Sequence, residues 1–189
     1  GVTLEQVKQW IGNGADILLR RAIQRRYDLQ GEMDEALVTR VRQKFDERYL
    51  AGLDRDFTLF PGVLATLQRL RSAGYRMAVA TNKPHPFVAP LLQEAGLMPL
   101  FDQLLGGDLL PQRKPDPAPL LHVCQTQQVA PERSVMVGDS KNDVLAAKAA
   151  GMPVIGLTYG YNHGEPIAVS KPDWVMDHFC QLGDLLLAN

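Results

Sequence analysis

The spacing of hydrophobic positions changes once along this chain, close to residue 56. Up to that point apolar residues recur at the three- or four-residue spacing of amphipathic helices. A first helix is expected after Thr3, because Thr3 and Gln6 match the pattern of a capping box. Two more helices are expected over residues 17–26 and around residues 37–45. No strand pattern occurs here, so residues 1–56 are predicted to form an all-helical unit.

Residues 57–189 show a different pattern, in which short apolar runs alternate with segments that have the spacing of amphipathic helices. These runs are predicted to be strands: residues 77–80, 101–105, 134–137, 153–157 and 174–176. Short strands without an alternating polar face are typical of a parallel sheet that helices cover on both faces. The predicted fold class is therefore α/β, with a doubly wound, Rossmann-type core at 57–189 and a small helical cap at 1–56.

The charge balance, the apolar runs and the cysteine count limit the kinds of molecule that this protein is expected to bind. The 189 residues include 20 Lys and Arg and 21 Asp and Glu, and the net charge of −1 gives no electrostatic reason to expect nucleic acid or an anionic membrane. No apolar run reaches the roughly 18 residues that a membrane span needs. With 2 cysteines and no Cys-x-x-Cys pair, the sequence indicates a reduced, cytoplasmic protein without a zinc site. We expect a monomer or a homodimer.

Polar side chains that suit phosphate chemistry follow two of the predicted strands. Thr81 and Asn82 come directly after the strand at 77–80, where a hydroxyl and an amide can bind a phosphate beside a helix N-terminus. Alternatively, Asn82 caps the next helix, with Pro84 in its first turn. Lys114 precedes a proline, which holds it in an extended conformation. It can neutralise a phosphate and a nearby carboxylate, or it is a solvated loop lysine.

The most informative segment is Gly138-Asp139-Ser140-Lys141-Asn142-Asp143, where an apolar strand meets two carboxylates at the start of a helix. Ser140 and Asp143 match a capping box, which explains Asp143 but leaves Asp139 without a structural role. Ligands bind at such strand ends in open α/β sheets, and paired carboxylates suit Mg²⁺. Asp139 and Asp143 are therefore the candidate metal ligands of a phosphate-handling site.

These junctions, in this order and at this spacing, resemble the motifs of the haloacid dehalogenase (HAD) superfamily of phosphohydrolases. Thr81 resembles its second motif, Lys114 its third, and Asp139 with Asp143 its fourth. The resemblance implies a HAD-like core and Mg²⁺-dependent hydrolysis of a small phosphorylated metabolite through an aspartyl-phosphate. It also implies catalytic roles for Thr81 and Lys114, and substrate binding by Thr81, Asn82 and Lys114. Asp139 and Asp143 would bind Mg²⁺, with Asp143 supporting Asp139 or pairing with Lys114.

Within the superfamily the chain is most similar to bacterial phosphatases of 2-phosphoglycolate, which makes that compound the first choice of substrate. The matching segments are Trp10-Ile11-Gly12-Asn13-Gly14-Ala15, Thr81-Asn82-Lys83-Pro84, Gly106-Gly107-Asp108, residues 138–143 and residues 156–162. Two alternatives stay open. One is a sugar-phosphate phosphatase or phosphomutase of the same superfamily. The other is a non-catalytic protein that binds a phosphate ligand or a partner.

One motif of the superfamily is absent from the sequence. Its members carry a strand that ends in Asp-x-Asp-Gly-Thr, whose first Asp is the nucleophile, and no such sequence occurs here. Asp54 and Asp56 lack the glycine and the preceding apolar strand, so we interpret them as a linker. We expect the core to lack its first strand, between 77–80 and 134–137, and the chain alone to be inactive. The loss of this strand would leave two buried strand edges, where each unsatisfied backbone group costs about 1–3 kcal/mol.

Overall fold

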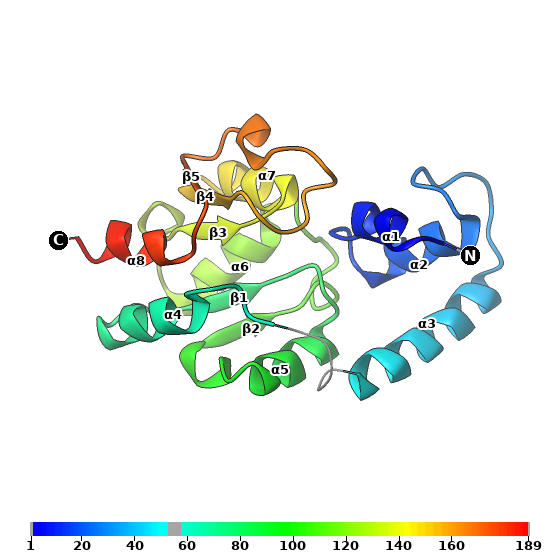
Figure 1. Ribbon diagram of the computed structural model, residues 1–189, viewed down its shortest axis with the longest axis horizontal. Coiled ribbons are helices and arrows are strands. Elements are labelled where there is room, and N and C mark those ends of the chain that lie inside the picture. Colours follow the sequence, from blue (N-terminus) through cyan, green and yellow to red (C-terminus); the bar gives the residue numbers. More distant parts are fainter. Residues whose placement is uncertain (1, 53–57, 189) are drawn as a thin grey trace.

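The computed structural model describes residues 2–52 and 58–188, which form an α/β core and a helical cap (Figure 1). The N-terminus lies in the cap, and the C-terminus lies at the far end of the core. No helix among the described residues is long and apolar enough to cross a membrane. The predicted change from helical to α/β structure is confirmed. The boundary at 56/57 and the linker residues Asp54 and Asp56 lie outside the described residues.

The cap consists of three helices: α1 (Leu4–Trp10), α2 (Ala15–Gln24) and α3 (Glu35–Ala51). The capping box at the start of α1 is present, with the Gln6 amide donating to Thr3 Oγ1 at 3.3 Å. The apolar faces of the helices bury Trp10, Leu19 and Val38 in a small core. All three predicted helices are therefore confirmed. The second ends at Gln24 because the next residue adopts a left-handed conformation.

The core contains all five predicted strands, and helices separate the first four of them. The elements in order are α4 (Val63–Ser72), β1 (Ala78–Ala80), α5 (His85–Glu94), η1 (Met98–Leu100), β2 (Gln103–Leu105), α6 (Ala118–Gln127), η2 (Pro131–Arg133), β3 (Met136–Gly138), α7 (Lys141–Ala149), β4 (Val154–Leu157), η3 (Ile167–Ser170), β5 (Trp174–Met176) and α8 (Cys180–Leu186). The α/β class predicted from the sequence is therefore confirmed.

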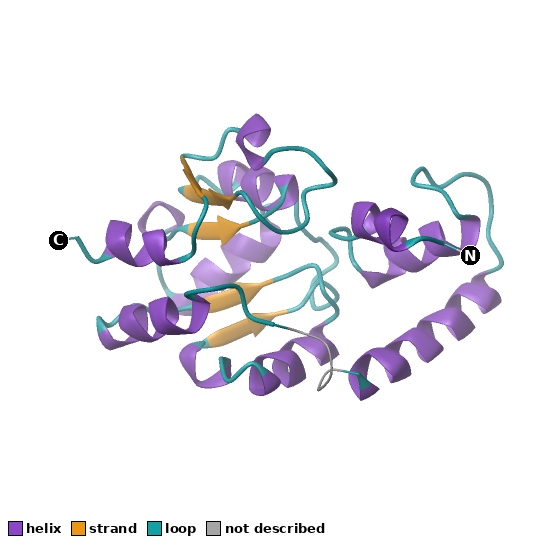
Figure 2. Ribbon diagram, in the orientation of Figure 1, coloured by secondary structure: helices purple, strands orange, loops and turns teal. Residues whose placement is uncertain are grey.

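The strands are parallel, as predicted, but they form two groups (Figure 2). In one group β1 pairs with β2, and in the other the order is β3-β4-β5. Among the described strands, β1 and β3 are not hydrogen-bonded to each other. The division falls between the same two strands where the resemblance places a missing strand.

Two hydrophobic clusters nevertheless join both groups of strands into one core. On one face, Ala80 of β1 and Met136 of β3 pack against the cluster formed by α6, α7 and β4. On the other face, Met77 and Val137 pack against the cluster that includes Leu70 of α4 and Leu182 of α8. Helices therefore cover both faces, which explains why the strands have no alternating polar side.

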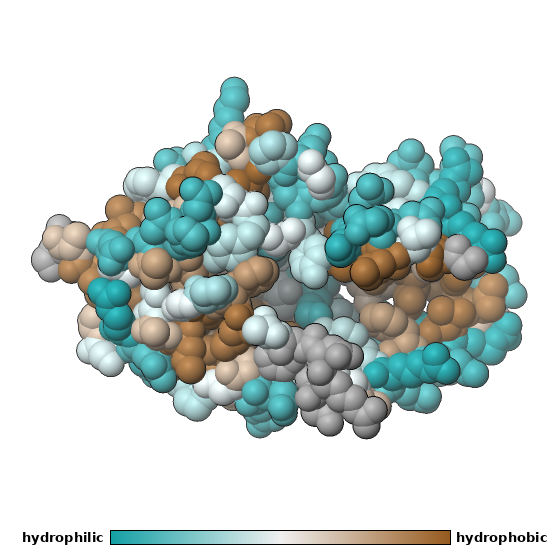
Figure 3. Space-filling view, in the orientation of Figure 1, coloured by the Kyte–Doolittle hydropathy of each residue, from teal (hydrophilic) through white to brown (hydrophobic). Residues whose placement is uncertain are grey.

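The cap contacts the core through the end of α3 as well as through the turn between α1 and α2. The ring of Tyr49 in α3 lies 4.9 Å from that of Phe87 in α5, and Phe45 stacks on Tyr49 at 5.6 Å. The Lys83 ammonium lies 4.5 Å from the centre of the Tyr49 ring and donates a hydrogen bond to its hydroxyl. In Figure 3 the core and the cap are two lobes with a notch between them.

A carboxylate at the start of β2 ties three elements of the core together. Asp102 accepts a hydrogen bond from the Met77 amide at 2.9 Å, and Arg71 of α4 donates to both of its oxygens at 2.8 Å. The Met77 N–H, together with the Arg71 guanidinium, lowers the pKa of the Asp102 carboxyl. The contribution of Asp102 to stability is therefore complete above its unfolded-state pKa and is lost as the pH falls through its lower folded-state pKa.

We expect Asp102→Ala to lower the free energy of unfolding at pH 7 by roughly 1–2 kcal/mol, less than for a fully buried group because the carboxylate is partly exposed. The difference from the wild type should shrink as the pH falls below about 4, where the carboxylate protonates in the unfolded state before it does so in the folded state. Denaturant unfolding at several pH values measures both effects. The control is Asp184→Ala, since Asp184 is 74% exposed and lies 4.0 Å from Arg69. An equal loss of stability at pH 7 in the control would contradict the assignment.

Candidate active site

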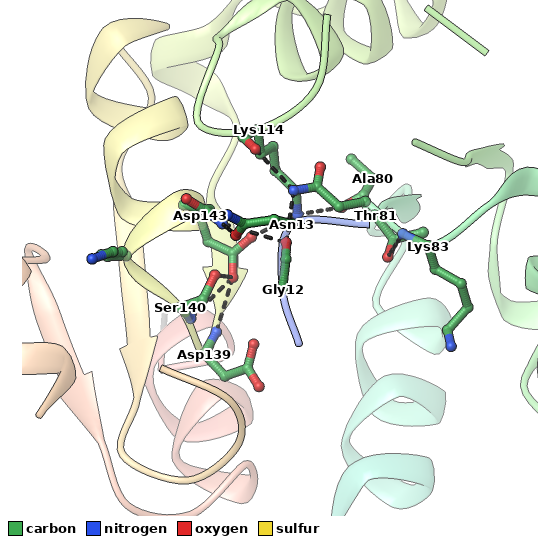
Figure 4. Close-up of polar contacts among 12 residues, drawn as sticks. Gly12, Asn13, Ala80, Thr81, Lys83, Lys114, Asp139, Ser140 and Asp143 are labelled. Atoms are coloured by element: carbon green, nitrogen blue, oxygen red, sulfur yellow. Dashed lines mark hydrogen bonds and ion pairs between the residues drawn. The ribbon is translucent and has the colours of Figure 1, made fainter. Parts of the chain in front are cut away.

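The three polar junctions predicted from the sequence meet at the carboxyl ends of β1 and β3 (Figure 4). Thr81 follows β1, Asp139 follows β3, and Lys114 approaches from the loop before α6. Parallel strands bring their carboxyl ends to one edge of a sheet, which is where ligands of open α/β folds bind. Residues separated by more than 50 positions in sequence therefore belong to one site.

Lys114 connects the two halves of this site. Its side chain is only 7% exposed, and Nζ donates to the carbonyl oxygen of Ala80 and to Asp143 Oδ1, both at 2.6 Å. Ala80 is the last residue of β1, and Asp143 lies in the first turn of α7, which follows β3. The lysine thus bridges the ends of the two strand groups, and the alternative of a solvated loop lysine is wrong.

Asp143 uses its second oxygen to organise the turn after β3. Oδ2 accepts from the amides of Asp139 and Ser140 at 3.1 Å and from the Ser140 hydroxyl at 2.9 Å. The predicted capping box is therefore confirmed. A Cβ at Gly138 would lie 2.4 Å from the Asp143 Cβ, so only glycine allows this close approach. Both oxygens of Asp143 are engaged by protein groups.

Asp139 has a different environment, although it is only four positions away. Its carboxylate is half-buried, and Oδ2 accepts from the Tyr161 amide at 2.9 Å. Burial raises the pKa of the Asp139 carboxyl, the Tyr161 N–H acts in the opposite direction, and the charge of Asp143 adds to the increase. A half-buried carboxylate with a raised pKa gains from a cation, which is the setting of a metal ligand.

Within residues 2–52 and 58–188, no three His, Cys, Asp or Glu side chains gather so that they could hold a metal ion. A site made only of protein ligands is therefore not formed by these residues. Mg²⁺ commonly uses one or two carboxylates and completes its shell with water and substrate phosphate. Asp139, with Asp143 beside it, fits that kind of oxygen-rich partial site.

Thr81 and Asn82 occupy the end of β1, but Asn82 is not the cap of α5. The residue at the N-cap position is Pro84, and Asp108 Oδ1 accepts from the His85 amide at 2.7 Å. The alternative that Asn82 caps this helix is therefore wrong, because a carboxylate from the next βα junction does so. The Thr81 hydroxyl accepts from the Lys83 amide at 3.1 Å, which leaves its own O–H free to donate.

The Asn82 side chain instead links the core to the cap. Its Nδ2 donates to the carbonyl oxygens of Lys114 at 2.8 Å and of Gly12 at 2.9 Å. Gly12 lies in the turn between α1 and α2, so this amide holds the cap over the site. Both hydrogens of the amide nitrogen are engaged.

Three groups of this site were not predicted from the sequence: Asn142, Asn13 and the Tyr161 amide. Asn142 is buried, and its Nδ2 donates to Asn13 Oδ1 at 3.1 Å and to the Gly12 carbonyl at 3.3 Å. The role of Asn142 could have been suspected from the sequence, because this residue lies between Ser140 and Asp143 of the capping box and has no capping role itself. The role of Tyr161 could not be detected, since it depends on a backbone amide.

Comparisons with known proteins identify the family of the chain. The model of the haloacid dehalogenase-like hydrolase family matches residues 2–151. Phosphoglycolate phosphatase of Vibrio vulnificus strain CMCP6 is 46% identical over 189 residues, which are 100% of this chain and 83% of that protein. The corresponding enzyme of Photobacterium profundum is 46% identical over 185 residues, or 98% of this chain and 81% of that protein.

Solved structures share the same fold. A predicted phosphoglycolate phosphatase from Haemophilus somnus has a TM-score of 0.90 at 40% identity, over 97% of this chain and 82% of that one. CbbY of Rhodobacter sphaeroides in complex with phosphate has a TM-score of 0.81 at 27% identity, over 96% of this chain and 81% of that one.

The family model covers most of the chain, and the relatives match it from end to end. The predicted HAD-like fold is confirmed by the same comparisons. The chain therefore belongs to the haloacid dehalogenase-like hydrolase family, within which it is a phosphatase.

Proposed function

We propose that this phosphatase hydrolyses a small phosphorylated metabolite in a Mg²⁺-dependent reaction, with 2-phosphoglycolate as the preferred substrate. The observation that carries the proposal is the position of Lys114, whose buried ammonium lies between the end of β1 and the turn that holds Asp139. A fixed positive charge at this edge suits the binding of a phosphate dianion. The names of the relatives support 2-phosphoglycolate as its source.

Asp139 is proposed to hold Mg²⁺, and Asp143 to support it. When bound, Mg²⁺ supplies charge neutralisation and polarises a phosphoryl oxygen. Asp143 fixes the Lys114 ammonium and the Asp139 backbone at once, because Oδ1 accepts from Lys114 Nζ and Oδ2 accepts from the Asp139 amide. These two roles are assigned from the hydrogen bonds of the carboxylates, because both oxygens of Asp143 already bond to protein groups.

The remaining predicted residues are proposed to bind the phosphoryl group and to close the site. The Thr81 hydroxyl donates to a phosphoryl oxygen, and Lys114 offsets its charge. Asn82, predicted as a phosphate ligand, is proposed to contribute mainly by fastening the Gly12 carbonyl of the cap above the site. A closed cap excludes water other than the hydrolytic one.

The proposal also requires a carboxylate that accepts the phosphoryl group and forms the aspartyl-phosphate. The family resemblance assigns it to the end of a strand between β1 and β3. The lack of hydrogen bonds between these two strands, which pack into the same clusters, supports such a position. Without that strand, the chain is expected to be inactive by itself.

Substituting Asp139 tests the metal assignment. In the protein expressed from its whole gene, Asp139→Asn should lower Mg²⁺-dependent turnover roughly 100-fold or more, because a neutral amide replaces the charged ligand. Phosphate release at several Mg²⁺ concentrations, together with calorimetric titration of Mg²⁺, measures both consequences. Asp184→Asn, at an exposed carboxylate of α8, is the matched control. Near-normal turnover and Mg²⁺ affinity in Asp139→Asn would refute the metal role.

The Lys114–Asp143 pair should behave as a buried unit. Lys114→Met is expected to cost about 3–5 kcal/mol of unfolding free energy, because it leaves the Asp143 charge buried without its partner. The double variant Lys114→Met/Asp143→Leu should regain part of that loss, although it stays inactive. Guanidinium unfolding of both variants and of Asp143→Leu completes the cycle. Strict additivity of the two single effects would show that the pair is not coupled.

A substrate panel separates 2-phosphoglycolate from the alternatives within the superfamily. We expect kcat/KM for 2-phosphoglycolate to exceed that for hexose and pentose phosphates by at least about tenfold, which corresponds to roughly 1.4 kcal/mol of transition-state binding. Phosphate release measured with each compound at saturating Mg²⁺ provides the comparison. A higher kcat/KM for a sugar phosphate would favour a sugar-phosphate phosphatase, and interconversion of sugar phosphates without phosphate release would favour a mutase.

A further inference from the structure

The loop after β4, residues 158–166, reaches the Asp139 carboxylate through its backbone. The Tyr161 amide donates to Asp139 Oδ2 at 2.9 Å. The preceding residue, Gly160, has a φ of +115°, and a Cβ there would lie 1.9 Å from the same oxygen. The loop therefore approaches the carboxylate as closely as a backbone can, and any displacement of the loop changes the environment of Asp139.

The next residue anchors the loop to the helix that follows Asp139. Asn162 Oδ1 accepts from the Lys141 amide at 2.7 Å, and its Nδ2 donates to the Glu165 carbonyl at 2.8 Å. Lys141 is the first residue of α7, whose amide has no partner inside the helix. Asn162 thus holds the middle of the loop in one position relative to α7.

The third residue in succession contacts the cap. His163 Nδ1 lies 2.7 Å from the carbonyl oxygen of Gln9 in α1, and since a carbonyl only accepts, Nδ1 is the donor. The ring also lies edge-on to Tyr27 at 6.1 Å, and a Cβ at Gly12 would be 3.3 Å from Nε2. His163 adopts a φ of 54°, which a non-glycine residue holds at some cost. Its side chain is therefore fixed between α1 and the turn after it.

We propose that residues 161–163 couple docking of the cap to the orientation of Asp139, with His163 as a positioning residue that acts through this loop. The proposal rests on the proposed role of Asp139 as a Mg²⁺ ligand. Three consecutive residues contact the carboxylate, the helix after it and the cap. Such a short segment has little freedom to move at one end while the other stays fixed.

Coupling of this kind is reciprocal. If the docked cap favours the loop position in which Tyr161 orients Asp139, then Mg²⁺ bound at Asp139 favours the docked cap by the same factor. Two measurements therefore test the same coupling free energy between cap docking and Mg²⁺ binding. One is the effect of His163 on Mg²⁺ affinity, and the other is the effect of Mg²⁺ on the exposure of α1.

The experiment uses His163→Ala, His163→Asn and wild type, each expressed from the whole gene. His163→Ala should lower Mg²⁺ affinity about fivefold in calorimetric titration. It should also raise the KM for 2-phosphoglycolate by a larger factor than it lowers kcat. His163→Asn should restore most of the affinity, because Asn tolerates a positive φ and offers an amide donor near the position of Nδ1. His178→Ala, at an exposed histidine before α8, is the matched control and should leave the affinity unchanged.

Hydrogen exchange of the α1 amides provides the second measurement and needs no variant. Saturating Mg²⁺ should slow exchange over residues 4–10 of the wild type, and it should have a smaller effect in His163→Ala. Unchanged Mg²⁺ affinity in His163→Ala, or α1 exchange in the wild type that does not respond to Mg²⁺, would overturn the coupling while the metal role stands. A wild type that binds no Mg²⁺ would overturn the proposed function and the coupling together.

Discussion

The buried contact between Lys114 and Asp143 is the interaction on which the rest of the site depends. The two side chains are 7% and 8% exposed, and each is costly to bury without the other. Because Lys114 also bonds to Ala80, the pair joins the end of β1 to the start of α7 at the point where the two groups of strands are not hydrogen-bonded to each other. The same carboxylate shapes the turn that presents Asp139.

The cap is held over this centre largely by polar contacts near the site. Asn82 and Asn142 donate to the Gly12–Asn13 turn, and His163 donates to Gln9. Amide and imidazole hydrogen bonds exchange readily with water, so such contacts have a modest net free energy. The aromatic contact between Tyr49 and Phe87 at the end of α3 adds an apolar component to this attachment.

The fold could be predicted to a large extent from local patterns. The five strands lie where short apolar runs predicted them, and both capping boxes are present, because these features depend on neighbouring residues only. The site could be predicted in part. The residue types at the three junctions indicated a phosphate site, and the structure brings them together. The interpretation of Asn82 as a helix cap was wrong, since Asp108 from another junction takes that place.

The sequence by itself determined the α/β class, the helical cap and the residue types at the carboxyl ends of the strands, because hydrophobic period and capping are local properties. It also determined the family resemblance, through the order of Thr81, Lys114 and Asp139. Only the tertiary structure decided that Lys114 is buried against Asp143, that Asn82 fastens the cap, and that the Tyr161 amide bonds to Asp139. Those contacts join distant segments, and their partners are often backbone groups that every residue carries.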